Sequence, residues 1–127
     1  EFRGRMPLAE YLELHGEVDV LLDAHPFAGH TVSCHALWMG VPVVTLAGDR
    51  HCARMVASVL QNVGLPELIA HTPAQYVEIA ASLAAARLAD LGYPDVEPEN
   101  PYWDGRSLTV ADPDGWRGVL DWGLAEE

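Results

Sequence analysis

Residues 19–48, DVLLDAHPFAGHTVSCHALWMGVPVVTLAG, decide the fold of this chain. An apolar run ends at Asp23, a loop with Gly29 follows, and the pattern predicts a helix over 31–39 and a second strand over 42–46. Buried strands that alternate with a helix are typical of a parallel sheet with a right-handed crossover. Ligands bind such sheets beyond the carboxyl ends of the strands, where free N–H groups at helix N-termini attract anions. The loop over 25–31 is therefore the predicted phosphate site.

The surrounding sequence predicts the other elements of this sheet. Helices are expected over 7–16, from Asp49 to about 62, and over 73–91, and strands over 19–23 and 68–70. Asp49 is the predicted N-cap of its helix, and Thr72 with Gln75 fits a capping box. Trp38 lies at helical spacing and is expected in the core. Asp49 and Arg50 are also candidates for lining a cleft.

The C-terminal part changes character and predicts an antiparallel β-hairpin. Strands are expected over 107–111 and 116–122, with a type I turn at 112–115, DPDG. Trp103, Trp116 and Trp122 are expected to cover the inner face of this hairpin. The shift in composition predicts two domains, 1–84 and 85–127. The fold class is thus α/β, a Rossmann-like parallel sheet with a C-terminal antiparallel hairpin.

Charge and composition exclude several classes of partner. The 127 residues carry a formal net charge of -12, and none of the seven basic residues is Lys. An acidic surface repels the phosphates of nucleic acids and anionic lipids, so neither partner is expected. No apolar run approaches the roughly 20 residues that span a bilayer. The two cysteines, Cys34 and Cys52, favour a reduced, cytoplasmic protein.

A family resemblance lies in residues 30–70, HTVSCHALWMGVPVVTLAGDRHCARMVASVLQNVGLPELIA. This run closely resembles the C-terminal catalytic lobe of O-linked N-acetylglucosamine transferases of the SPINDLY-like form, and the resemblance extends over about residues 7–83. It implies half of a B-type glycosyltransferase, in which this lobe binds the UDP part of a UDP-N-acetylglucosamine donor. A protein acceptor is implied for the full enzyme, with neither cofactor nor metal. The other lobe and its lysine are not found in these 127 residues, so the chain alone is expected to be inactive.

The resemblance also assigns the site residues. His30, Thr31 and Val32 stand where the family has the His-Thr-Thr that meets the diphosphate, so Val32 lacks one hydroxyl. His35 stands where the family usually carries Asp or Glu near the ribose. Gly29 lets the backbone approach the ligand. The alternative is that these residues only turn the chain and cap a helix.

Residues 85–122 resemble the closing segment of a glyoxalase/bleomycin-resistance (vicinal oxygen chelate) module, on the run NPYWDGRSLTVADPDGWRGVL over 100–120. Val119 stands where metal-dependent members carry Glu, so no metal is expected there. His25, His30, Cys34 and His35 also lack the spacing of a zinc site. Two alternatives to the donor-binding interpretation follow: a recombined or engineered non-catalytic fold, and a glyoxalase-like small-molecule binder that forms a homodimer through its tail strands.

Overall fold

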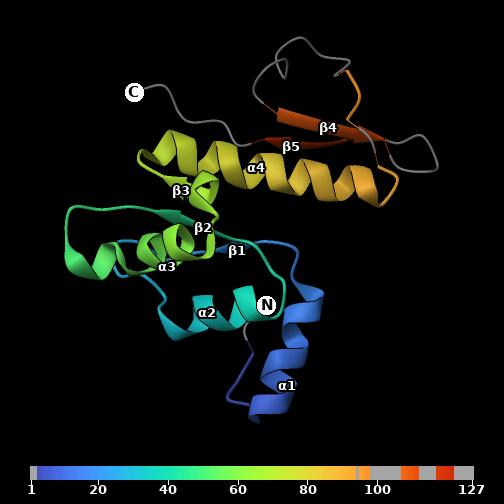
Figure 1. Cartoon of the computed structure of the whole chain (residues 1–127). Helices are drawn as coiled ribbons and strands as arrows, with labels where there is room; N and C mark the ends of the chain where they lie inside the picture. Colours follow the sequence, from blue (N-terminus) through green and yellow to red (C-terminus); the bar gives the residue numbers. More distant parts are fainter. Residues whose placement is uncertain (1–2, 94, 98–106, 112–116, 122–127) are drawn as a thin grey trace. The chain divides into compact units, whose positions relative to one another are not determined.

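The computed structural model describes residues 3–93, 95–97, 107–111 and 117–121. The chain divides into two compact units, Glu1–Tyr76 and Val77–Glu127. Figure 1 shows their helices and strands in sequence colours. The predicted boundary near residue 84 stays a prediction, and each unit is described by itself.

The first unit is built on a three-stranded parallel sheet in the order β1-β2-β3. The strands are β1 (Leu21–Leu22), β2 (Val43–Leu46) and β3 (Ile69–Ala70). Helix α2 (Thr31–Trp38) connects β1 to β2, and helix α3 (Met55–Val63) connects β2 to β3. This confirms the predicted α/β class and parallel sheet, although the first strand is shorter than the predicted 19–23.

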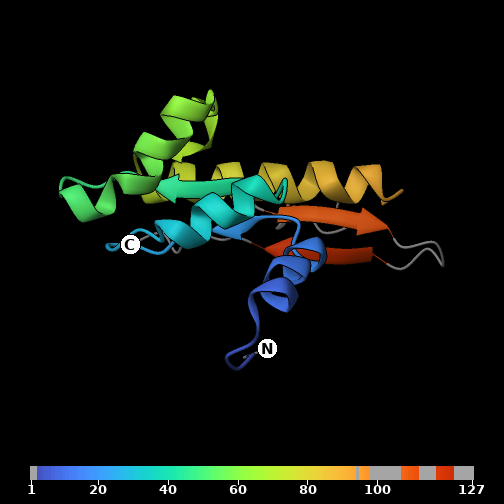
Figure 2. The same cartoon turned by 60° about the horizontal axis from the view of Figure 1, so that its bottom comes forward.

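The core of this unit surrounds the central strand. Val43 and Val44 of β2 are fully buried, and so are Val56 and Leu60 of α3. Both α2 and α3 pack against β2, which is the teal arrow in Figure 2. The consecutive residues Val43, Val44 and Thr45 are all buried, so both faces of β2 are covered, as is typical of a central parallel strand. Each fully buried Val or Leu contributes roughly 1.5–3 kcal/mol relative to an exposed one.

The predicted N-terminal helix is shorter than expected. Helix α1 spans Leu8–Glu13 and continues as a 3-10 turn, η1 (Leu14–Glu17). Two further 3-10 turns, η2 (His51–Ala53) and η3 (Pro66–Leu68), flank α3. No helix in the described ranges is both long enough and apolar enough to cross a bilayer.

The prediction that Asp49 caps the third helix is wrong. The chain first makes the η2 turn, and α3 begins only at Met55, with Arg54 as an N-cap that makes no side-chain cap bond. A tight reversal causes the delay: the Gly48 N–H donates to the Ala53 carbonyl at 3.2 Å. A Cβ at Gly48 would lie 2.7 Å from the Ala53 Cβ, so only glycine fits here.

The prediction that Trp38 lies in the core is also wrong, because its side chain is 87% exposed. Helix α2 instead buries the small residues Ser33 and Ala36. Small side chains let a helix axis lie close to its sheet. Because α2 (TVSCHALW) contains no Asp, Glu, Lys or Arg, helical spacing alone does not identify its buried face.

The start of helix α4 (Pro73–Asp90) confirms half of the predicted capping box. The Gln75 N–H donates to the Thr72 hydroxyl at 3.2 Å. The Gln75 side-chain oxygen, however, accepts from the His71 N–H at 2.9 Å, rather than from that of Thr72. Both bonds satisfy backbone donors at the helix start.

The second unit contains most of α4 and two paired strands, β4 (Ser107–Ala111) and β5 (Arg117–Asp121). These strands pair antiparallel, with Thr109 opposite Val119. Asp95 bridges Val110 on β4, and the Val96 N–H donates to the Thr109 carbonyl at 2.8 Å. The predicted turn at 112–115 and Trp103, Trp116 and Trp122 lie outside the described residues, so the hairpin connection stays a prediction.

Candidate functional site

A buried carboxylate organises the loop that follows β1. The Asp23 side chain is 6% exposed. One carboxylate oxygen accepts from the Gly29 N–H at 2.8 Å, and the other accepts from the Thr45 hydroxyl at 2.6 Å. The Ser33 hydroxyl approaches the first oxygen at 3.5 Å. A buried charge needs such partners, so Asp23 fixes the loop against β2 and α2.

Gly29 is required by this arrangement. A Cβ at residue 29 would lie 2.9 Å from the Ser33 hydroxyl oxygen and 3.1 Å from a carboxylate oxygen of Asp23. Its N–H donates to Asp23 at 2.8 Å, which holds the loop close to the buried carboxylate. Gly29 therefore allows the loop to close on Asp23.

His30 has an unusual backbone conformation, with φ 41° and ψ -107°. The Val32 N–H donates to the Gly29 carbonyl at 3.0 Å, which makes residues 29–32 a tight turn. His30 occupies its first central position, where a type II′ turn favours glycine. A non-glycine residue there stores strain, which is typical of functional loops.

The N-terminal end of α2, residues 30–32, has free backbone donors and is called the mouth of α2 below. His30, Thr31 and Val32 are all exposed. Within the described part of the chain, the N–H groups of His30 and Thr31 donate no hydrogen bond. The ring of Phe27, which is 67% exposed, stacks on the His30 ring at 6.1 Å between centroids. Free N–H groups and the positive end of a helix dipole can hold an anion without a metal.

His35 lies one turn further along α2, and its ring contacts helix α1. The ring centroids of His35 and Tyr11 are 5.6 Å apart at an interplanar angle of 67°. The Nδ1 atom of His35 is buried and has no hydrogen-bond partner among the described residues. The structure thus brings residues 29–32 together at the mouth and places His35 beside Tyr11. The ligand contacts assigned to these five residues stay predictions.

Sequence reasoning missed Asp23 and Tyr76 as parts of this site. The Tyr76 hydroxyl, from the first turns of α4, donates to the Asp23 carbonyl oxygen at 2.9 Å. Burial raises the pKa of Tyr76, and the nearby charge of Asp23 raises it further. The available signal was an acidic residue placed directly after an apolar run, since such a residue must find polar partners where it is buried.

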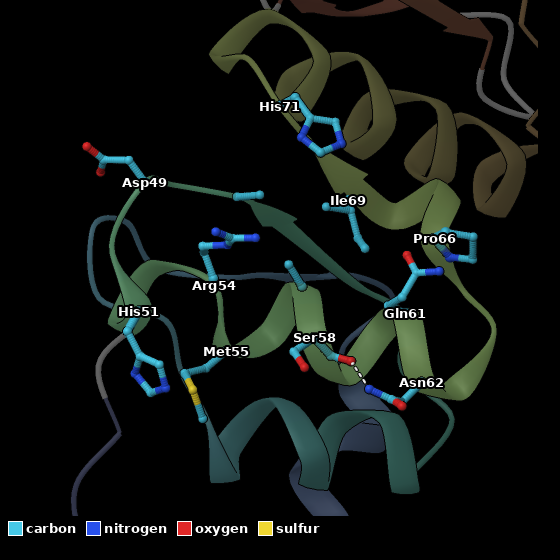
Figure 3. Close-up of a pocket in the computed structure, with 12 residues that line it drawn as sticks. Asp49, His51, Arg54, Met55, Ser58, Gln61, Asn62, Pro66, Ile69 and His71 are labelled. Carbon is cyan, nitrogen blue, oxygen red and sulfur yellow. Dashed lines mark hydrogen bonds between the residues drawn. The ribbon is translucent and has the colours of Figure 1, made fainter.

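A second feature of the first unit is a cavity of about 680 Å³ alongside α3 (Figure 3). It lies between α3 and the residues that follow β2 and β3. None of residues 25–35 lines it. Asp49 lines it and Arg50 does not. The expectation that these two residues line a donor cleft stays a prediction. Its lining residues are Ala47, Asp49, His51, Arg54, Met55, Ala57, Ser58, Gln61, Asn62, Pro66, Ile69 and His71.

Two hydrogen bonds join the loop after β1 to the turn beside this cavity, and in one of them the Cys52 thiol donates to the Pro26 carbonyl at 3.8 Å. The Ala28 N–H donates to the Cys52 carbonyl at 3.0 Å. Cys52 and Cys34 are free thiols. Among the described residues, no three His, Cys, Asp or Glu side chains are grouped as a metal ion would require.

Two family models match the chain. The model for glycosyl transferase family 41 matches residues 9–90, and the model for a YycE-like C-terminal domain matches residues 76–121. The two matches overlap over residues 76–90, which lie within α4. The tail resemblance therefore corresponds to a YycE-like segment.

The relatives agree with this division. The probable UDP-N-acetylglucosamine–peptide N-acetylglucosaminyltransferase SPINDLY of Hordeum vulgare is 36% identical over 104 residues, which cover 79% of this chain and 11% of that protein. The SPINDLY protein of Oryza sativa is 35% identical over 120 residues, covering 88% and 13%. The Bacillus subtilis protein YycE is 52% identical over 47 residues, covering 35% and 34%. The chain thus spans only about a tenth of the SPINDLY relatives.

A solved structure also matches. A mutant form of the Thermobaculum terrenum O-GlcNAc transferase aligns with a TM-score of 0.66 and 42% sequence identity. The alignment covers 72% of this chain and 18% of that one. The three-stranded parallel sheet and its helices therefore correspond to part of such a transferase.

Proposed function

We propose, because the chain belongs to glycosyl transferase family 41, that its first unit is the UDP-sugar-binding part of an O-linked N-acetylglucosamine transferase-like enzyme. The observation that carries this proposal is the mouth of α2, where the His30 and Thr31 N–H groups are free and exposed. This mouth follows the carboxyl end of β1, where α/β sheets bind nucleotides. The proposed donor is UDP-N-acetylglucosamine.

In this proposal each residue of the mouth has a role. The N–H groups of His30 and Thr31, together with the Thr31 hydroxyl, hold diphosphate oxygens. Gly29 allows the loop to close on Asp23. Val32 has no hydroxyl, so the donor that the second Thr of the family's His-Thr-Thr would provide is missing. His35, one turn further along the helix, is the proposed ribose contact, and its ring packs beside Tyr11.

The proposed reaction of the complete enzyme is inverting transfer. A Ser or Thr hydroxyl of a protein acceptor attacks the anomeric carbon, the bond to UDP breaks, and the helix amides stabilise the charge on the leaving diphosphate. These 127 residues alone provide the donor side, and we expect no turnover from them. The free thiols of Cys34 and Cys52 support a cytoplasmic location.

A titration of the ¹⁵N-labelled chain with UDP tests the donor proposal. We expect amide shifts at His30 and Thr31, since these donors are free in the structure. Uridine, which has no phosphate, is the matched control and should not change the chemical shifts of these amides. If millimolar UDP moves neither amide, the donor proposal fails.

The overlap of the two family matches within α4 favours a second candidate. In this alternative the chain is a recombined or engineered fold, and the 25–31 loop is only scaffold. Both parent segments would share a helix, so the junction would preserve the helical pattern. The same UDP titration separates the two candidates, because a scaffold loop gives no specific shift.

A further inference from the structure

The cavity beside α3, called the α3 cavity below, is a separate candidate binding site. Its volume of about 680 Å³ lies within the size range of sites that bind small ligands. Its lining residues lie outside the 25–35 region and within the first unit. A ligand bound here would therefore leave the mouth of α2 open.

One wall of the α3 cavity is a row of polar side chains. Arg54 at the N-cap, Ser58 and Gln61 are spaced four and three residues apart, so they share one face of the helix. Figure 3 shows this row along α3, with Ile69 and His71 across from it. At 1.5 Å per residue the row spans about 10 Å, which is the length of about three residues of an extended peptide.

Arg54 provides a positive charge in this row. The residue is exposed, and within the described part of the chain no carboxylate forms an ion pair with its guanidinium. This is notable because Asp49 lines the same cavity and the chain has 19 acidic residues against seven basic ones. A guanidinium without a partner suits a carboxylate, which it can bind through two parallel hydrogen bonds.

The rest of the cavity offers neutral hydrogen-bonding groups and an apolar wall. The Asn62 amide nitrogen donates to the Ser58 carbonyl at 2.8 Å, which orients this side chain and leaves its oxygen as an acceptor. The Ser58 hydroxyl and the Gln61 amide suit the N–H and C=O groups of a peptide backbone. Pro66 and Ile69 provide apolar contact.

We propose that the α3 cavity binds an extended peptide segment, with an acidic side chain of that segment on Arg54. The neutral groups pair with the peptide backbone, and the guanidinium selects the acidic residue. This goes beyond the donor-binding proposal and does not depend on it, because it requires neither UDP nor the mouth of α2.

The test uses the ¹⁵N-labelled 127-residue chain without UDP. The probes are the blocked tripeptide acetyl-alanyl-glutamyl-alanine amide and its glutamine counterpart. We expect amide shifts at Ser58, Gln61 and His71, and about fivefold tighter binding of the glutamate peptide, which is the scale of an exposed ion pair. The absence of shifts at millimolar peptide, or equal binding of both peptides, overturns the proposal.

A matched pair of variants checks the role of the charge. Arg54→Gln should abolish the preference for the glutamate peptide. Arg50→Gln makes the same change of charge at an exposed residue that does not line the cavity, and it should keep the preference. Equal effects of the two variants would contradict the assignment. Free glutarate serves as a third probe, and if it binds as tightly as the glutamate peptide, the cavity is a site for small acids instead.

Discussion

The loop after β1 has no room for a side chain at Gly29. Its N–H is bonded to Asp23, and the space for a Cβ is taken by Ser33 and Asp23. A larger residue must displace a buried carboxylate that also holds Thr45. The geometry of the proposed phosphate loop thus requires a residue without a Cβ at position 29.

Gly29→Ala should therefore lower the free energy of unfolding by about 1–3 kcal/mol, the usual cost of overpacking. It should also abolish the UDP-induced shifts at His30 and Thr31. Urea denaturation and the NMR titration measure the two effects. Gly16→Ala is the control, since a Cβ there meets no atom within 4 Å. Equal stability of the two variants would contradict the role given to Gly29.

His30→Gly should have the opposite effect on stability. Its φ of 41° costs roughly 1–3 kcal/mol in a non-glycine residue, whereas glycine loses roughly 0.5–1 kcal/mol of chain entropy. We expect a net gain of about 1 kcal/mol in the free energy of unfolding, measured in urea. Thr31→Gly, one residue further and inside the helix, should lose stability instead. A loss for His30→Gly as well would show that the backbone there is unstrained.

At the scale of elements, the start of α4 is tied to the end of β1. The Tyr76 hydroxyl donates to the Asp23 carbonyl oxygen, across 53 residues of sequence. Burial and the charge of Asp23 raise the pKa of Tyr76 above 10.0. The folded protein therefore holds the phenolic proton more tightly than the unfolded chain.

This raised pKa predicts how stability depends on pH. The contribution of Tyr76 is fully present below about pH 10 and is lost as the pH rises through the folded pKa. At pH 8, Tyr76→Phe should cost about 1 kcal/mol, the usual net value of one hydrogen bond. Above pH 10 the difference between the variant and the original chain should shrink. Urea denaturation at both pH values measures this, and Tyr93→Phe is the control.

Sequence predicted the elements that have one strong determinant. The apolar run of β2 and the cap at Thr72 were sufficient to place a buried strand and the start of α4. The start of α3 was not predictable, because Asp49 is a good cap by residue type and only the packing of Gly48 on Ala53 excludes it. Trp38 was misplaced because apolar character alone does not reveal which face of α2 meets the sheet.

The candidate site was predictable to a similar extent. A loop between a strand and a helix indicates where free N–H groups gather, and His30 and Thr31 are found there. The α3 cavity was not predictable, because its lining from residues 47–71 comes together only when α3 packs beside the segments that follow β2 and β3. The support given by Asp23 likewise depends on a contact with Thr45, on the neighbouring strand.

The net charge of -12 acts at the scale of the whole molecule. UDP is an anion, so this charge opposes its approach even where uncharged amides bind it locally. Salt shortens the Debye length from about 30 Å at 0.01 M to about 8 Å at 0.15 M and weakens this repulsion. The affinity for UDP should therefore rise with sodium chloride over this range. Calorimetric titration measures it, and an affinity that falls with salt would point to a cationic site.

The bond between the Ala28 N–H and the Cys52 carbonyl links the proposed phosphate loop to the α3 cavity. It connects the backbone beside the proposed phosphate loop to the η2 turn, whose His51 lines the α3 cavity. A ligand that shifts the phosphate loop or the η2 turn must either lengthen this hydrogen bond or move the other segment as well. Occupancy on one side would then alter affinity on the other, and thermodynamic reciprocity requires the effect to be equal in both directions.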